Sequence, residues 1–373
     1  MIKTLRKSYV NFKGWNSKKK FLLIESDDWG SIRMPNKQTY ELLLKRGLPV
    51  DKSRYSKFDS LESCKDLDRL FETLNSVKDK NNKNACLTAN FLVANPDFEK
   101  IKKQNFEQYY YEDIFQTYDR YGFDNMKEFI QKGIDNNVFF PQFHGREHMH
   151  PQRWLYAVKN CENERICFDL NAIPGVPINC LPTQTKKFLA AVDYYDVTEK
   201  NFVEEALEDG LHLFENIFGY KSKSFIAPQS VRGNHLDSIL FKNGVLFHQN
   251  GQQLLPSFED KNNKIVNHYW GHRNEFGMTS WRRNVTFEPS KNSNFDSVSE
   301  ALKEIENAFF WGKPAVLNSH RVNFVGSLNE KNQLDSLSKL KDLLQKVVKK
   351  WPEVEFINSQ QLGEFITNSE SKN

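Results

Sequence analysis

The sequence predicts an α/β fold in which parallel strands alternate with helices around a single barrel. Seven short apolar runs alternate with longer segments of helical periodicity from one end of the chain to the other. This alternation is typical of βα units that build a parallel sheet. No linker separates the units, and α/β barrels commonly exceed ~250 residues as one domain. We therefore expect one α/β barrel built from seven βα units.

The seven expected strands are short runs of apolar and aromatic residues. Most begin or end near Gly, Pro, Asn, Asp or Ser, the residues that favour turns. In chain order they are 21–28, 85–93, 139–144, 223–228, 245–249, 314–318 and 354–357. Two further segments, 264–270 and 278–287, fit strands or extended loops equally well.

The helices are expected where apolar residues recur three and four positions apart. In the clearest case Leu67, Leu70 and Leu74 share one helical face. Gly47 is placed to stop the first helix, and Pro151 stands at an initiating position of another. The expected helices are 39–47, 66–78, 125–136, a helix from 151, 198–218, 234–243, 296–311 and 328–350.

The predicted organisation is one barrel with short additions at both ends. A basic N-terminal arm covers residues 1–20, the barrel covers 21–366, and a polar tail covers 367–373. Long loops are expected near 94–124, 160–197 and 251–295.

Composition narrows the class of protein. The net charge is only +4, with 52 basic and 48 acidic residues, which argues against a nucleic-acid partner. No run of eighteen apolar residues occurs, so no transmembrane segment is expected. The basic start has no apolar core of a secretory signal, and the five cysteines include no CxxC pair, which favours reduced thiols and a cytoplasmic location. No feature of the sequence specifies an oligomeric state.

The stretch 139–150 ends in three histidines within seven residues. His144 and His148 are four apart, so both imidazoles can face one ion. Neutral imidazole is a common zinc ligand, but a site needs a third ligand from elsewhere. The best donors are the adjacent carboxylates Asp27 and Asp28 at the end of the first strand.

Polar residues follow the carboxyl ends of several expected strands. Besides the Asp pair and the His pair, these are Gln229, which follows Pro228, and His320. Strand ends of this kind converge on one face of a parallel barrel, where active sites lie. Each motif alone has a simpler interpretation: the Asp pair can form a turn or a helix N-cap, and the His pair can be structural.

The ordered motifs resemble those of the polysaccharide deacetylases, the NodB-type carbohydrate esterases, whose members share a distorted (β/α)7 barrel. The motifs are Ser26-Asp27-Asp28-Trp29-Gly30, His144-x-x-x-His148, Phe225-Ile226-Ala227-Pro228 and Val316-Leu317-Asn318-Ser319-His320. The resemblance implies that Asp28, His144 and His148 hold a divalent metal, most often Zn²⁺. It also implies that Asp27 is the general base and His320 the general acid.

Two departures from the family pattern concern catalysis. The family's third motif has an arginine where this chain has Ile226, and that arginine normally orients the base; Arg232 or Arg146 could replace it. The last motif normally reads Leu-x-His, whereas two residues separate Leu317 from His320.

Several residues are expected to contact the substrate. An aromatic ring can stack on a sugar, although a tryptophan is more often buried in the core. An arginine can bind a carboxylate or phosphate, although two adjacent arginines are more often solvated surface charges. His150 is a surface residue, a partner of the other histidines or a substrate contact. The expected contacts are Trp29, Arg146, His150, Pro228, Gln229, Trp281 and Arg282.

The sequence thus predicts a metal-dependent hydrolase with a carbohydrate substrate. It would remove an acyl group, typically acetyl, from an N-acylated sugar or a polysaccharide precursor, by cutting an amide or an ester bond. The alternatives are another metal-dependent carbohydrate hydrolase on the same barrel and a non-catalytic glycan-binding relative.

Overall fold

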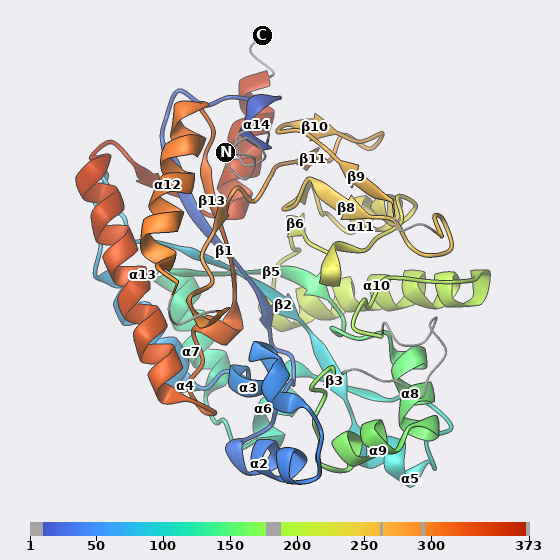
Figure 1. Cartoon of the computed structure of the whole chain (residues 1–373). Helices are drawn as coiled ribbons and strands as arrows, with labels where there is room; N and C mark the ends of the chain where they lie inside the picture. The colour runs from blue at the N-terminus through green and yellow to red at the C-terminus, as the bar shows by residue number, and fades with distance from the viewer. Residues whose placement is uncertain (1–9, 177–187, 262–263, 292–294, 371–373) are drawn as a thin grey trace.

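The computed structural model describes residues 10–176, 188–261, 264–291 and 295–370, and its centre is a curled, mostly parallel sheet of ten strands. The sheet runs in the order β10-β11-β7-β6-β5-β2-β1-β13-β12, and β14 pairs with β1 outside this path (Figure 1). Its strands are β1 (Phe21–Trp29), β2 (Leu87–Leu92), β5 (Phe139–Gly145), β6 (Ser224–Phe225), β7 (Phe247–His248), β10 (His272–Arg273), β11 (Thr279–Ser280), β12 (Val285–Thr286), β13 (Ala315–His320) and β14 (Glu355–Phe356).

The longest strand, β1, lies in the middle of the sheet. All nine of its residues are buried, as expected for a parallel strand covered on both faces. It pairs in parallel with β13 on one side and with β2 on the other, and the β1–β13 register places Asp27 opposite His320. Two of the residues expected to carry chemistry therefore lie side by side at one end of the sheet.

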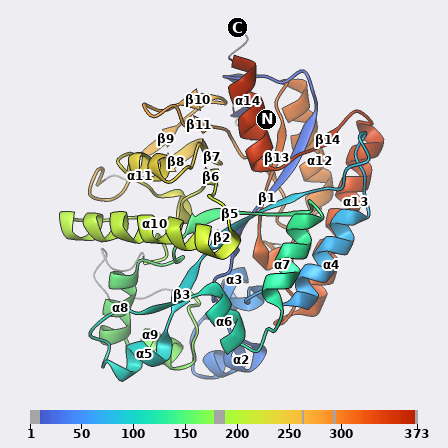
Figure 2. The ribbon, with the colours of Figure 1, turned by 180° about the vertical axis from the view of Figure 1, so that it is seen from behind.

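Helices cover the outside of the curled sheet, as the two opposite views show (Figures 1 and 2). The α-helices are α2 (Lys37–Lys45), α3 (Arg54–Phe58), α4 (Cys64–Asn75), α5 (Phe98–Lys103), α6 (Ile114–Arg120), α7 (Met126–Asp135), α8 (Pro151–Asn160), α9 (Glu162–Asp169), α10 (Val197–Phe218), α11 (Leu236–Lys242), α12 (Ser297–Phe310), α13 (Glu330–Lys350) and α14 (Ser359–Glu370). Short 3₁₀ turns are η1 (Val50–Lys52), η2 (Pro228–Ser230), η3 (Pro289–Lys291) and η4 (Arg321–Asn323).

The largest apolar core lies between β1, β2, β5 and β13 and the helices α4, α7, α12 and α13. The N-terminus of α4 is set by a capping box, because Ser63 and Asp66 each bond to the other's backbone N–H. Leu67, Leu70 and Leu74 of the same helix are completely buried, so the predicted helical face is the one that packs on the sheet.

Two small hairpins extend from the main sheet. They are β3 (Ala94–Pro96) with β4 (Tyr111–Asp113), and β8 (Gln252–Leu254) with β9 (Ile265–Asn267). Both fall in segments expected to be long loops, so those segments carry short elements of their own. Residues 177–187, inside the expected loop 160–197, lie outside the described residues.

The α/β class is confirmed, and a strand lies in each of the seven segments where one was expected. Among the described residues, the pairing of strands runs from β10 to β12 without closing into a ring, so the strands form a curled half-barrel sheet. The ambiguous segments 264–270 and 278–287 contain β9, β11 and β12. Residues 367–370, expected in the polar tail, continue α14.

Two expectations drawn from the composition can be compared with the structure: the reduced state of the cysteines and the absence of a transmembrane segment. Cys161 is disulfide-bonded, whereas Cys64, Cys86 and Cys167 are free, so the prediction that all thiols are reduced is wrong at Cys161. The cysteines therefore do not support a reducing compartment. Within the described ranges, no helix combines the length and the hydropathy needed to cross a bilayer.

Candidate active site

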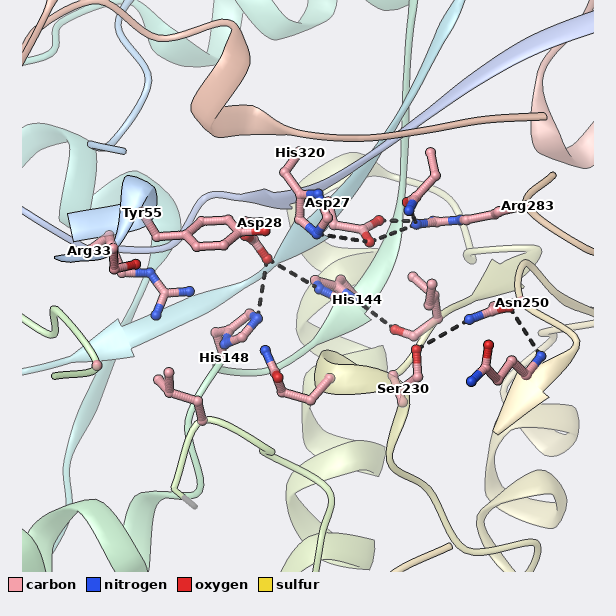
Figure 3. A pocket seen from close by; sticks show the side chains of 18 of the residues that line it. Asp27, Asp28, Arg33, Tyr55, His144, His148, Ser230, Asn250, Arg283 and His320 are labelled. Atoms are coloured by element: carbon pink, nitrogen blue, oxygen red, sulfur yellow. Dashed lines mark hydrogen bonds and ion pairs between the residues drawn. The ribbon is translucent and has the colours of Figure 1, made fainter. Parts of the chain in front are cut away.

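A pocket of about 480 Å³ opens where the carboxyl ends of β1, β5 and β13 meet. Figure 3 shows its side chains, which come from segments far apart in the sequence. The residues that line it are Asp27, Asp28, Arg33, Ser53, Tyr55, His144, His148, Pro174, Gly175, Leu189, Ile226, Ala227, Gln229, Ser230, Asn250, Gln252, Arg283, Asn318 and His320.

Asp28, His144 and His148 form a buried cluster on one wall of this pocket. One ligand atom from each lies within 4.8 Å of the other two. Oδ1 of Asp28 is 3.6 Å from Nε2 of His144 and 3.2 Å from Nε2 of His148. Asp28 has a φ of 76°, an uncommon conformation for a residue with a side chain, which directs its carboxylate toward the two rings (Figure 3).

The chemistry of the cluster fits a divalent metal. Nδ1 of His144 lies 2.7 Å from the carbonyl oxygen of Ile226, which fixes the ring and leaves Nε2 for a ligand. Burial lowers the pKa of His148, despite the opposing effect of Asp28, and so favours the neutral imidazole that binds metals. Burial would raise the pKa of Asp28, but the two histidines outweigh it and hold the pKa well below its usual value. One carboxylate and two imidazoles are a ligand set suited to Zn²⁺ that leaves coordination positions open.

Asp27, the neighbour of Asp28 in β1, is held by two side chains. Arg283 donates to both of its oxygens, at 2.7 and 2.9 Å, and Asn90 donates to Oδ1 at 2.7 Å. Burial would raise the pKa of Asp27, but the charge and hydrogen bonds of Arg283 outweigh it and keep the pKa well below its usual value. Asp27 is therefore an oriented, ionised carboxylate.

Arg283 is itself fixed by a buried network. Its guanidinium also donates to Glu25 at 2.6 Å, to Gln249 at 2.8 Å and to Asn318 at 2.9 Å. Glu25 in turn accepts from Trp281 at 3.0 Å and from Ser359 at 2.7 Å. The orientation of Asp27 thus depends on residues from opposite ends of the chain.

His320 faces Asp27 from the neighbouring strand. Its Nε2 lies 4.0 Å from Oδ2 of Asp27, and its Nδ1 is hydrogen-bonded to Glu288. Burial would lower the pKa of His320, but the carboxylate of Glu288 outweighs it and raises the pKa to about 9. The imidazole is therefore protonated at neutral pH, with its free N–H toward the pocket.

Six expected site residues line this pocket: five that were expected to bind a metal or transfer protons, and Gln229, which was expected to contact the substrate. The five are Asp27, Asp28, His144, His148 and His320. The extra residue between Leu317 and His320 does not remove the histidine from the site, because β13 stays in register with β1 through His320.

The other expected substrate contacts do not line the pocket, because each is held elsewhere. Trp29 and Trp281 are fully buried and donate to Ser26 and Glu25 respectively. His150 is fully buried beside the start of α8. Pro228 is buried in η2.

The arginines that were expected to orient Asp27 or contact the substrate are bound to other residues. Arg146 is bound to Glu147 and Asp209, and Arg232 pairs with Asp237, so neither contacts Asp27. Arg282 donates at 3.2 Å to Asn267 and to the carbonyl oxygen of His268. The arginine that holds Asp27 is Arg283, and the only sequence signal for it is the Arg282-Arg283 pair itself.

Comparison with known proteins finds likeness in structure rather than in sequence. No protein-family model matches the sequence, and no curated protein matches it. A protein from Mycobacterium smegmatis assigned as a polysaccharide deacetylase is 11% identical with a TM-score of 0.41, over 96% of this chain and 94% of that one. Peptidoglycan deacetylase PdaC from Bacillus subtilis is 11% identical with a TM-score of 0.41, over 95% of each chain.

A third similar structure is BA3943 from Bacillus anthracis, a CE4 family pseudoenzyme. It is 10% identical with a TM-score of 0.37, over 94% of this chain and 67% of that one. At such low identities and TM-scores, the function must be argued from the site itself. The solved structures that resemble this chain include polysaccharide and peptidoglycan deacetylases.

Proposed function

We propose that the protein is a metal-dependent deacylase that removes an acetyl or similar acyl group from an N-acylated sugar. The observation that carries the proposal is the arrangement of three units in one pocket. They are the Asp28-His144-His148 cluster, the Asp27–Arg283 pair and the His320–Glu288 pair. A metal site flanked by one ionised carboxylate and one protonated imidazole suits hydrolysis of an amide.

Asp28, His144 and His148 would hold the cation, which we propose is Zn²⁺. A bound divalent cation supplies Lewis acidity toward the acyl carbonyl and the attacking water. The protein supplies the rest: it fixes the ligand side chains by burial and through the bond between His144 and Ile226.

Proton transfer is divided between Asp27 and His320. Asp27 accepts a proton from the water that attacks the acyl carbon, and Arg283 keeps its carboxylate ionised and oriented. The carbon–nitrogen bond then breaks, and Nε2 of His320 donates its proton to the leaving nitrogen. The products are a free amino sugar and a carboxylate, and the two side chains exchange protons with solvent before the next cycle.

Other polar residues that line the pocket support a carbohydrate substrate. Gln229, Ser230, Asn250 and Gln252 present amides and a hydroxyl to the pocket, and such groups pair with sugar hydroxyls. Gln229 and Ser230 have φ values of 56° and 58°, two consecutive strained residues of the kind that occurs at binding sites.

The non-catalytic alternative requires that no residue replaces the family's arginine, at whose position this chain has Ile226. Arg283 reaches Asp27 from a different segment and makes the contact that the missing residue would make. This contact supports turnover over simple glycan binding.

The proposal is tested by acyl release from the full chain loaded with zinc. Acetate is measured with N-acetylglucosamine oligomers as substrates, for the wild type and for Asp27→Asn and His320→Gln. Each variant should lose about 10²- to 10⁴-fold in kcat while keeping its metal, because neither side chain is a ligand. His212→Gln, on the exposed surface of α10, is the matched control and should retain full activity.

Two results would contradict the proposal. A metal-loaded protein that binds sugars but releases no acetate would be a glycan-binding protein. Release of reducing sugar in place of acetate would identify a glycosidase.

A further inference from the structure

Arg33 lies just after β1 and lines the same pocket as the metal cluster. Its side chain is 5% exposed, and its backbone carbonyl accepts a hydrogen bond from Ile173 at 2.9 Å. In Figure 3 the guanidinium lies between Tyr55 and His148. A fixed cation therefore faces the cavity a short distance from the proposed reaction centre.

The guanidinium has no hydrogen-bond or salt-bridge partner within the described part of the chain. Its Nε is buried without an acceptor. Its closest ring contact is with Tyr55, whose ring centroid is 5.8 Å from the guanidinium carbon. The neighbouring carboxylate of Asp59 is already bound by Arg321, at 3.0 and 3.1 Å.

Other buried arginines of this protein do have such partners. Arg283 is paired with Asp27 and Glu25, and Arg321 with Asp59 and Glu62. This difference matters because burial of an arginine without a counter-ion is unfavourable, and the planar guanidinium is suited to carboxylate and phosphate.

The pocket leaves room for an anion at this point. Gly175 packs beside Arg33 and Leu189, because a Cβ added there would lie 3.6 Å from Nη1 of Arg33 and 2.6 Å from Cδ1 of Leu189. Arg33 is one of the residues that line the cavity of about 480 Å³, so a ligand in this cavity can reach its guanidinium.

We infer that Arg33 binds an anionic substituent, a carboxylate or a phosphate, of the sugar that enters the pocket. The inference rests on the proposed function, and it specifies the substrate class as acidic N-acyl sugars. Arg33 is then a specificity-determining residue: it selects the substrate through a group that does not react.

The test is calorimetric binding to the full chain, with Asp27→Asn as the background so that no turnover occurs. The probes are N-acetylmuramic acid, N-acetylglucosamine 6-phosphate and neutral N-acetylglucosamine, and comparison of the first two distinguishes a carboxylate from a phosphate. At least one acidic sugar should bind about 10- to 100-fold more tightly than the neutral one. Arg33→Met should abolish this preference, and Arg33→Lys should retain part of it because the charge remains.

Arg46→Met is the matched control, since Arg46 is an exposed arginine at the end of α2 and should leave the preference unchanged. Equal binding of acidic and neutral sugars, or a preference that survives Arg33→Met, would overturn the inference. Acetate release from neutral sugars with no acidic preference would leave the deacylase proposal intact and remove only this one. An Arg33-dependent preference without acetate release in the Asp27-containing protein would support the anion site and contradict the deacylase.

Discussion

At the residue scale, the most consequential contact is the pair of hydrogen bonds that Arg283 donates to Asp27. It holds the carboxylate in one orientation and keeps it ionised. The same guanidinium also donates a hydrogen bond to Glu25, which is completely buried in β1. Arg283 therefore holds both Asp27, the proposed base, and Glu25 of the same strand, β1.

Arg283→Lys tests this contact. Lysine keeps the charge but cannot make two parallel hydrogen bonds to a carboxylate, so Asp27 should lose its orientation. We expect kcat for acetate release to fall about 10- to 100-fold with bound zinc unchanged. Arg282→Lys, one position earlier and directed toward Asn267, should have little effect. Equal losses in the two variants would show that the orientation of Asp27 does not depend on Arg283.

The contact between His320 and Glu288 leads to a prediction about how activity depends on pH. The charge of Glu288 raises the pKa of His320 to about 9, and only the protonated ring can donate to the leaving nitrogen. Activity should therefore be lost as the pH rises through this pKa. In Glu288→Gln the stabilising charge is gone, so the pKa of His320 should fall and the alkaline limb of the kcat profile should move to lower pH. An alkaline limb that stays in place would exclude His320 as the acid.

At the element scale, the site depends on how closely the helices approach the sheet. α7 packs through Gly133, where a Cβ atom would lie 2.5 Å from Cζ of Phe71 and 2.8 Å from Cβ of Phe139. Phe139 begins β5, the strand that carries His144. Only a glycine allows the helix to lie this close to the strand.

Gly133→Ala should accordingly destabilise the protein although alanine favours helices. The steric overlap, typically 1–3 kcal/mol, exceeds the gain of about 1 kcal/mol in helix propensity. We expect a net loss of about 1 kcal/mol in the free energy of unfolding, measured with urea. Gln131→Ala, on the exposed face of the same helix, is the control and should change the stability by less than about 0.5 kcal/mol. A Gly133→Ala variant more stable than the wild type would show that the packing readily adjusts.

At the scale of the whole molecule, the metal cluster joins β1 to the end of β5. A cation bound to Asp28, His144 and His148 would link two strands that are separated in the sheet by β2. Binding to the folded state alone should stabilise the entire fold.

Zinc at one hundred times its Kd should raise the free energy of unfolding by about 2.7 kcal/mol over the chelated protein. Thermal unfolding with and without chelator measures this as a shift in Tm. His148→Gln and Asp28→Asn should largely abolish the shift, whereas His212→Gln should keep it. A zinc-induced shift that persists in both ligand variants would place the bound metal elsewhere.

Much of this fold is predictable because its strands are buried on both faces. Strands such as β1 and β5 therefore read as apolar runs that end in polar residues, and their order in the chain predicts a parallel sheet. β10, β11 and β12 have the sequences His-Arg, Thr-Ser and Val-Thr, so no apolar run marks them. The segment 278–287, which contains β11 and β12, fits a strand or an extended loop equally well, and β10 lies in no expected strand.

The sequence by itself determined the α/β class, the positions of the main strands and the five side chains that meet in the pocket. These features are local: each follows from the residues of one segment and from the rule that parallel strands end on the same face. The tertiary structure alone decided which arginine holds Asp27 and which arginine is left facing the pocket without a partner. Arg283 is 256 positions from Asp27 in the chain, and no local pattern specifies a contact at that separation. Such pairings depend on how distant segments pack.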